Sequence, residues 1–156
     1  MKISIVTPSY NQSRFLEKTI LSVWTQEGDF ELEHIVIDGG SSDSSIEILL
    51  KYDHLYKAQL FPFRCKRMSF SWESKPDRGQ ADAINKGFAI SSGDILGWLN
   101  SDDLFFDDSS LQKIGQSFKN NNADLIVGNV EMIDEAIDIN KTNKTNKINK
   151  MINTTK

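Results

Sequence analysis

Short apolar runs alternate with helical patterns along the first 130 residues, and this alternation constrains the fold more than any other feature. Residues 3–6 form an apolar run broken by Ser4, residues 95–99 (ILGWL) form another, and residues 33–37 (EHIVI) end in a third. Runs of this length separated by helical segments are typical of βαβ units, in which successive strands are parallel. The sequence therefore predicts an α/β fold with a mainly parallel sheet.

The remaining elements are predicted from weaker signals. Two further strands are expected over residues 69–74 and 124–130. The expected helices are one around Phe15 to Trp24 capped by Ser13, one around Ile46 to Leu50 capped by Ser42 or Asp43, and two over residues 79–90 and 110–118. Residues 54–68 have no clear period, so no element is predicted there.

Charge divides the chain into a body and a tail. The net charge is −4, but residues 1–139 contain all 22 acidic residues and carry −9, whereas residues 140–156 carry +5. The tail consists almost entirely of Asn, Lys and Thr, and we expect it to be disordered because it buries too little apolar surface. The acidic body argues against nucleic-acid binding, which needs clustered Lys and Arg. The prediction is one domain, 1–139, followed by a low-complexity tail, 140–156.

Targeting signals are not evident in the sequence. Cys65 is the single cysteine, so no disulfide can form within the chain, and a reducing compartment fits. The N-terminal apolar run is too short for a signal peptide, and no stretch approaches the roughly 20 apolar residues of a membrane span. A cytoplasmic location is therefore expected, while peripheral membrane association stays open.

Polar residues gather where the predicted strands end. These clusters are residues 7–11 (TPSYN), 38–43 (DGGSSD), 76–80 (PDRGQ) and 100–103 (NSDD). In open α/β sheets, ligands bind beyond the carboxyl ends of the strands. Four polar clusters at one edge predict a composite binding pocket.

Asp102 and Asp103 are the sharpest candidates for metal ligands. Adjacent carboxylates repel each other unless a cation or strong hydrogen-bond donors lie nearby. Mg²⁺ or Mn²⁺ binds one or two carboxylates and completes its shell with water and phosphate oxygens. In the alternative interpretation, one Asp caps a turn and the other is solvated. Asp107 and Asp108 are interpreted as helix caps.

Asp38 is the second candidate. Its carboxylate could accept from a nucleobase imide or a ribose hydroxyl, while Gly39 and Gly40 would let the backbone approach a ligand. The alternative is an ordinary turn Asp before two glycines. No G-x-G-x-x-G or Walker loop is present, which removes the main support for dinucleotide oxidoreductases and P-loop enzymes. His34 is expected to be a packed core residue.

Four motifs, TPSYN, VIDGGSSDSS, SKPDRGQADAINKG and GDILGWLNSDD, occur in an order and spacing that resembles the N-terminal half of family 2 glycosyltransferases. The resemblance covers about residues 2–135. It implies a Rossmann-like GT-A fold, a three-layer sandwich that binds a nucleotide-sugar, often a UDP-sugar. The likeness also suggests a role in cell-surface polysaccharide synthesis.

The resemblance also implies site residues by position in the motifs. The residues expected to contact the donor are Thr7, Pro8, Tyr10 and Asn11 around the base, Asp38 on uracil, Gly79, Gln80 and Asp82 near the nucleotide or sugar, and Asp102. Asp102 and Asp103 match the acidic motif that holds Mg²⁺ or Mn²⁺ in the family. Asn100 stands where that motif often has Asp, which weakens a metal role for position 100.

The catalytic base is not assigned. In the family this carboxylate lies well beyond the metal motif, and 53 residues follow Asp103 here, so we expect an incomplete GT-A domain that binds donor without transferring sugar. The acceptor would be a saccharide or a lipid-linked molecule. A non-catalytic nucleotide-sugar-binding fragment or a degenerate relic is the alternative. A nucleotidyltransferase is less well supported, because it needs a Gly-rich basic loop and TPSYNQSR supplies only Arg14.

Overall fold

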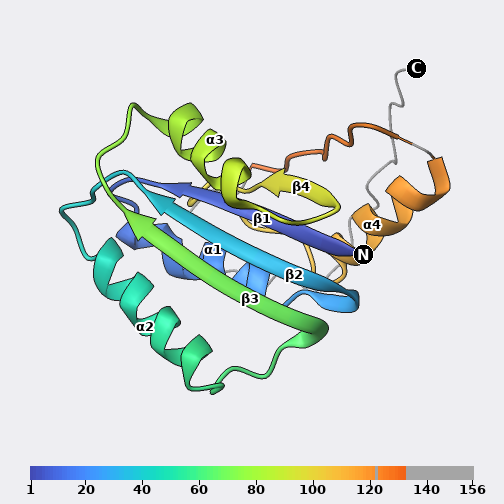
Figure 1. Ribbon diagram of the computed structural model, residues 1–156, viewed down its shortest axis with the longest axis horizontal. Coiled ribbons are helices and arrows are strands. Elements are labelled where there is room, and N and C mark those ends of the chain that lie inside the picture. Colours follow the sequence, from blue (N-terminus) through green and yellow to red (C-terminus); the bar gives the residue numbers. More distant parts are fainter. Residues whose placement is uncertain (122, 133–156) are drawn as a thin grey trace. The chain divides into compact units, whose positions relative to one another are not determined.

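The computed structural model describes residues 1–121 and 123–132 of the chain. Its elements are β1 (Lys2–Ser9), α1 (Ser13–Trp24), β2 (Glu27–Asp38), α2 (Ser45–Lys57), β3 (Arg64–Ser74), α3 (Gln80–Ile90), β4 (Ile95–Trp98) and α4 (Ser110–Asn121) (Figure 1). Residues 1–116 form one compact unit that contains the whole sheet, and residues 117–156 are a second unit. The tail expected over residues 140–156, and with it the domain boundary at residue 139, lies outside the described residues.

In the described part of the chain the sheet has four strands in the order β3-β2-β1-β4, and all of these pairs are parallel. Ser9 lies opposite Asp38, and Asp38 lies opposite Ser74, so β1, β2 and β3 end side by side. β4 pairs with the middle of β1, where Val6 lies opposite Trp98. The predicted α/β class with a parallel sheet is confirmed.

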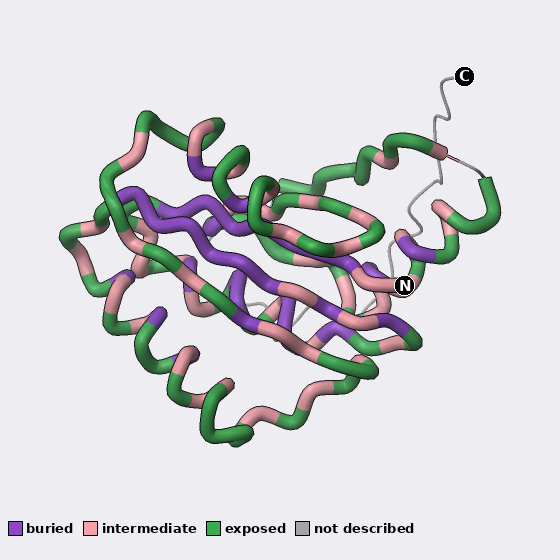
Figure 2. Tube along the Cα trace, viewed as in Figure 1, coloured by how far each residue is buried: buried purple, intermediate pink, exposed green. Residues whose placement is uncertain are grey.

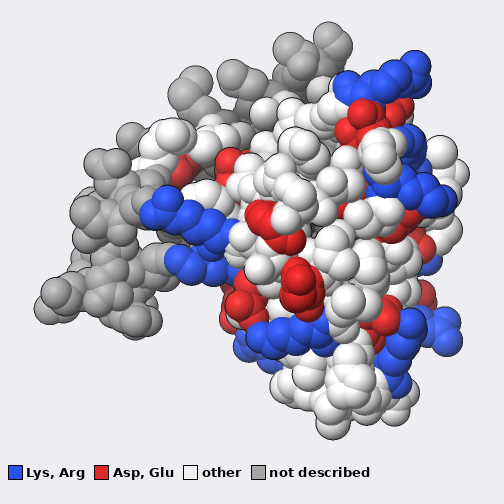
Figure 3. Space-filling model, turned by 90° about the vertical axis from the view of Figure 1, so that its left-hand side faces the viewer, with Lys and Arg blue, Asp and Glu red and all other residues white. Residues whose placement is uncertain are grey.

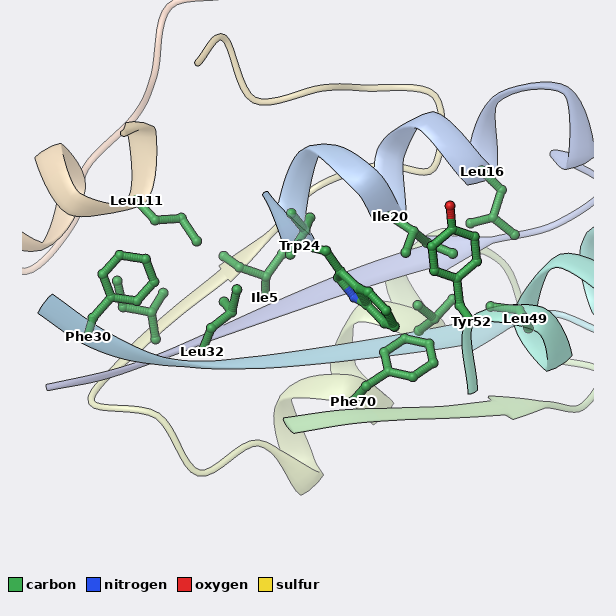
Figure 4. Close-up of a cluster of buried hydrophobic side chains, with 13 residues drawn as sticks. Ile5, Leu16, Ile20, Trp24, Phe30, Leu32, Leu49, Tyr52, Phe70 and Leu111 are labelled. Carbon is green, nitrogen blue, oxygen red and sulfur yellow. The ribbon is translucent and has the colours of Figure 1, made fainter. Parts of the chain in front are cut away.

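Helices cover both faces of the sheet and make three layers (Figure 1). On one face, Ile3 and Ile5 of β1 pack with α1 and α2 in the larger core cluster, which Figure 4 shows. On the other face, Val6 packs with Ala83 of α3 in a smaller cluster. Alternate residues of a strand point to opposite faces, which is why a continuous apolar run can serve both clusters. β1 and the carboxyl half of β2 are accordingly buried nearly throughout (Figure 2).

Trp24 and His34 lie at the centre of the larger cluster. The rings of Tyr52, Phe61, Phe63 and Phe70 surround Trp24 with centroid distances of 5.1–5.2 Å. The Trp24 indole N–H donates to His34 Nδ1 at 3.1 Å, and His34 Nε2 lies 3.0 Å from the Thr7 hydroxyl. Because an indole N–H can only donate, Nδ1 must accept, so Nε2 carries the hydrogen and donates to Thr7. His34 is buried, as the sequence predicted.

β2 and β3 begin earlier than the sequence predicted. β2 starts at Glu27 rather than residue 33, and β3 starts at Arg64 within the stretch that had no clear period. α3 covers mainly the carboxyl half of its face of the sheet (Figure 1), so the first half of β2 alternates buried side chains such as Phe30 with charged side chains such as Glu31. One face of this segment is solvated, and its charges hide the strand from a search for apolar runs.

The fifth strand predicted over residues 124–130 is wrong. Residues 123–132 contain no strand, and the side chains of Leu125, Val127 and Val130 are exposed. High β-propensity alone does not make a strand, because the backbone also needs a neighbour to receive its hydrogen bonds.

One carboxylate caps the N-termini of two helices. Asp43 accepts from the backbone N–H of Ser13 at 2.9 Å and from that of Ser45 at 3.0 Å. Burial alone would raise the pKa of Asp43, but hydrogen bonds from Ser45 and Ser13 outweigh it and lower the pKa to about 2. The expectation that Ser13 caps α1 is therefore wrong, because the capping group comes from the loop before α2.

A Gly87→Ala variant is expected to lose about 1–2 kcal/mol of unfolding free energy. A Cβ at Gly87 would lie 2.3 Å and 2.7 Å from the two methyl carbons of Val6, in the contact between α3 and β1. Helix propensity alone predicts the opposite sign, a gain of up to about 1 kcal/mol. Urea unfolding measures the difference. Gly115→Ala is the matched control, since its Cβ would come close only to the flexible end of Met1 and would meet Ile3 Cδ1 at an ordinary 3.8 Å; equal effects of the two changes would contradict the prediction.

Within the described residues, no helix combines the length and the apolar character needed to cross a membrane.

Candidate functional site

The loops that follow the four strands meet at one edge of the sheet. In a parallel sheet all carboxyl ends face the same side, and the register places Ser9, Asp38 and Ser74 in one row. Figure 3 views the molecule from the end to which β1, β2 and β3 point in Figure 1. Acidic side chains lie near the middle of this face, with Lys and Arg side chains around them. The predicted convergence of the polar clusters is confirmed.

The first loop presents only part of its motif to solvent. Thr7 and Pro8 are buried, and Thr7 accepts the hydrogen bond from His34. Tyr10 is 62% exposed, and Asn11 is exposed with a positive φ of 52°. Asn11 joins the first loop to the second, since its N–H donates to Ser41 Oγ and its Oδ1 accepts from the Ser42 N–H, both at 2.8 Å. Tyr10 and Asn11 are therefore the surface of this motif, and Thr7 and Pro8 are its support.

Asp38 is fully buried and organises the second loop. Its carboxylate accepts from the N–H groups of Gly40 and Ser41 at 3.0 and 2.8 Å, and from the hydroxyls of Ser41 and Ser74 at 2.5 and 2.7 Å. Four donors from its own loop and from β3 occupy this carboxylate. The structure thus favours the turn interpretation of Asp38 over direct contact with a nucleobase.

The third loop packs against the second. A Cβ on Gly39 would lie 3.1 Å from the Asp77 carboxylate, so the absence of a side chain at Gly39 permits this approach. Asp77 Oδ1 accepts from the Gly79 N–H at 2.8 Å, and Gly79 has a positive φ of 108° at the start of α3. Asp82 is paired with Lys86 at 3.0 Å and Arg78 at 3.2 Å, and hydrogen bonds from these two residues lower its pKa to about 2.

Asp102 and Asp103 lie in a turn that α1 holds in place. The Asp103 N–H donates to the Asn100 carbonyl at 3.0 Å. The Thr19 hydroxyl lies 2.9 Å from the carbonyl oxygens of both Ser101 and Asp103 and can donate to either. Both carboxylates are exposed. The turn therefore presents two adjacent acidic side chains on a fixed backbone.

Gln80 links the third loop to this turn. Its side-chain amide donates to Asn100 Oδ1 at 2.6 Å, and Asn100 Nδ2 donates to Asp103 Oδ2 at 2.9 Å. With the contacts of Asn11 and Gly39, this bond makes the four clusters one connected set.

Residues 4–156 match the sequence profile described as "Glycosyl transferase family 2". The chain belongs to this family.

Relatives of this family 2 chain are also named as glycosyltransferases. It is 38% identical over 103 residues to an uncharacterized glycosyltransferase of Mycobacterium tuberculosis, covering 66% of this chain and 34% of that protein. It is 30% identical over 133 residues to the poly(ribitol-phosphate) beta-N-acetylglucosaminyltransferase TarP of Staphylococcus aureus, covering 81% of this chain and 36% of TarP. The chain thus spans about a third of the length of these relatives.

Solved structures of GT-A glycosyltransferases share the fold. S. aureus TarS in complex with UDP-GlcNAc superposes with a TM-score of 0.61 at 20% identity, over 80% of this chain and 33% of TarS. The mannosyltransferase PcManGT from Pyrobaculum calidifontis, in complex with GDP-Man and Mn²⁺, gives the same TM-score and identity over 78% of this chain and 33% of PcManGT. These likenesses confirm the predicted GT-A architecture of the family 2 chain.

The acidic turn of the family 2 chain fits a divalent cation that is shared with a ligand. No cluster of three or more His, Cys, Asp or Glu side chains suited to a metal occurs in residues 1–121 and 123–132. Asp102 and Asp103 offer hard carboxylate oxygens, and Mg²⁺ or Mn²⁺ is commonly held by one or two carboxylates together with phosphate oxygens. The donor set therefore suits a cation that binds together with a diphosphate.

Surface hollows also occur away from this edge of the sheet. One is lined by Tyr56, Phe61, Phe63 and Met68 together with Lys57 and Gln59, beside the end of α2. It has no acidic group, and none of the four motifs contributes to it. The strand-end surface is the better candidate site because its polar groups converge.

Sequence reasoning missed three of the residues that connect the site. Ser41 and Ser74 complete the Asp38 network, and Asp77 packs under Gly39. The available signal was position: Ser41 and Asp77 lie shortly after predicted strands, and Ser74 is the last residue of one. Nothing in the sequence indicated that Ser74 would reach Asp38, because that contact depends on the pairing of β2 with β3.

Proposed function

We propose that this chain forms the nucleotide-sugar-binding part of a glycosyltransferase, with UDP-sugar as its donor and Mg²⁺ or Mn²⁺ at Asp102 and Asp103. One observation carries the proposal: the four motifs of the family are connected by hydrogen bonds and close packing at one sheet edge, which ends in the exposed acidic turn. The complexes of TarS with UDP-GlcNAc and of PcManGT with GDP-Man and Mn²⁺ support a nucleotide-sugar as the ligand class.

Different exposed groups would bind the base and the diphosphate of the donor. The Tyr10 ring offers a flat surface on which a nucleobase can stack, and the neighbouring Asn11 side chain is already ordered by the second loop. Asp102 and Asp103 would hold the cation on the diphosphate side. When bound, that cation stabilises the negative charge that builds on the leaving nucleoside diphosphate.

The acceptor is proposed as a class only. A hydroxyl of a saccharide or of a lipid-linked molecule would attack the anomeric carbon of the donor, displace the nucleoside diphosphate and lose its proton to a base. No residue of the described chain is assigned as that base. We assign to this chain the binding and polarisation of the donor.

Mn²⁺ is expected to raise UDP affinity at least about tenfold, because Asp102 and Asp103 would hold a cation that also attracts the diphosphate. Asp103→Ala should abolish this gain while leaving metal-free UDP binding unchanged. Isothermal titration calorimetry with UDP and with GDP, each with and without Mn²⁺, measures both effects. Asp53→Ala is the control, because it also removes an Asp carboxylate, but one that pairs with Lys57 on α2 and lies outside the four motifs. Equal UDP affinity with and without Mn²⁺ would exclude the metal site, and failure of both nucleotides to bind would exclude the function.

Tyr10→Ala is expected to weaken UDP binding about tenfold in both conditions, because stacking of a base on an aromatic ring contributes about 1–3 kcal/mol. Leu60→Ala is the matched control: Leu60 is also 62% exposed but follows α2, outside the four motifs. The same titrations serve as the measurement. If Tyr10→Ala binds UDP as tightly as the control, the base does not lie on Tyr10.

A further inference from the structure

Gln80 and Asn100 form a chain of side-chain amides that ends on Asp103. Gln80 Nε2 donates to Asn100 Oδ1 at 2.6 Å, and Asn100 Nδ2 donates to Asp103 Oδ2 at 2.9 Å. Gln80 is the first residue of α3, and Asn100 follows β4, so the chain joins two separate elements. Its three side chains lie at the surface rather than in the core.

The chemistry of the carboxylate fixes the direction of this chain. An ionised carboxylate can only accept hydrogen bonds, so Asn100 must present its amide nitrogen to Asp103. The amide oxygen of Asn100 then faces Gln80, which must present its own amide nitrogen. Each amide orientation thus depends on the next group in the chain. A carboxylate at position 100 would instead repel Asp103.

The hydrogen-bonded side chains of Gln80 and Asn100 determine the orientation of the Asp103 carboxylate. Its backbone is fixed by the bond to the Asn100 carbonyl and by Thr19, and its Oδ2 is engaged by the Asn100 amide. Its other carboxylate oxygen, Oδ1, makes no hydrogen bond within the described part of the chain. A carboxylate held through one oxygen presents the other in a fixed direction.

We propose that Asn100 and Gln80 are positioning residues that orient Asp103 toward a divalent cation bound with the nucleotide, and that Gln80 couples the start of α3 to that cation. The inference rests on the proposed function. Neither residue touches the cation: Asn100 acts on Asp103, and Gln80 acts on Asn100. In metal sites, groups that hydrogen-bond to the ligands typically change metal affinity 10–100-fold when they are removed.

Gln80→Glu separates this arrangement from simple electrostatics. An added negative charge near the acidic turn should, by Coulomb attraction alone, strengthen cation binding. A carboxylate at position 80, however, can only accept, so the Asn100 amide would turn its nitrogen to position 80 and its oxygen to Asp103. Adding Mn²⁺ increases the UDP affinity of the wild-type protein by a certain factor. We expect this factor to be about tenfold smaller in Gln80→Glu. An unchanged or larger gain would overturn the proposal.

Asn100→Ala should lower the Mn²⁺ gain to a similar extent, and Gln80→Ala should add nothing in the Asn100→Ala background, because Gln80 acts only through Asn100. Additive losses would overturn the coupling. Gln116→Ala, an exposed amide on α4 with no hydrogen bond in the described residues, is the control and should leave the gain intact. Metal-free UDP affinity should stay constant in Asn100→Ala and in Gln116→Ala, whereas a structural defect would lower it.

A second readout needs neither metal nor nucleotide. In ¹⁵N-resolved NMR spectra of the free protein, the Asn100 side-chain amide signals should shift in Asp103→Ala and in Gln80→Glu, and not in Gln116→Ala. A wild-type protein with no Mn²⁺ gain would overturn the proposed metal site and this inference together. A normal gain that survives Asn100→Ala would overturn this inference alone.

Discussion

Lowering the pH from 6.5 to 5 is expected to reduce the free energy of unfolding by about 2 kcal/mol through one side chain, His34. Burial lowers the pKa of His34 from 6.5 to about 3, because a charged imidazole would lose its hydration beside Trp24 and Phe70. Between these values the unfolded chain binds a proton that the folded chain does not, so stability falls as the pH falls. Over the full range from pH 6.5 down to pH 3, the loss of unfolding free energy caused by His34 has an upper bound of about 5 kcal/mol.

The measurement is urea unfolding at several pH values from about 7.5 down to 5. His34→Gln should remove the slope, since a glutamine can still accept from Trp24 and donate to Thr7 but does not titrate. His54→Gln, on the exposed side of α2, should leave the slope intact. A wild-type protein equally stable at pH 7 and pH 5 would contradict the prediction.

The range above pH 5 separates His34 from the acidic groups. Burial alone would raise the pKa of Glu33, but hydrogen bonds from Lys2, Ser4 and Ser92 outweigh it and lower the pKa to about 2, from 4.5. Its contribution to stability is present above pH 4.5 and is lost only as the pH falls from there through 2.

Trp24→Ala is expected to reduce the free energy of unfolding by about 3–5 kcal/mol, the second large effect. The substitution removes the ring that contacts four aromatic side chains and leaves His34 Nδ1 without its donor. Trp24→Phe keeps an aromatic ring but not the indole N–H, and should cost about 1–3 kcal/mol. Urea unfolding at pH 7 compares the variants.

Trp98→Ala is the control for Trp24→Ala. Trp98 is 56% exposed on β4 and, among the residues that the structure describes, makes one ring contact, with Phe88 at 6.4 Å. Its removal should cost no more than about 1 kcal/mol. If Trp98→Ala were as damaging as Trp24→Ala, the larger core would not be centred on Trp24.

The candidate site was predictable in place but not in detail. The sequence puts four polar clusters directly after four strands, and the parallel sheet carries them to one edge because of its geometry. The residue types alone left two roles open for Asp38. The structure favours the internal one, because Ser74 on the neighbouring strand and the Gly40–Ser41 turn supply its donors.

The sequence by itself determined the α/β class, the existence of β1 to β4 and the family, because apolar period and motif order are local properties of the chain. Only the tertiary structure decided where β2 and β3 begin, since α3 covers part of one face and leaves charged side chains on the rest. It also decided against a strand over residues 124–130, which pair with no strand among the described residues. The amide chain from Gln80 to Asp103 likewise exists only because α3 and β4 meet at the same sheet edge, 20 residues apart in sequence.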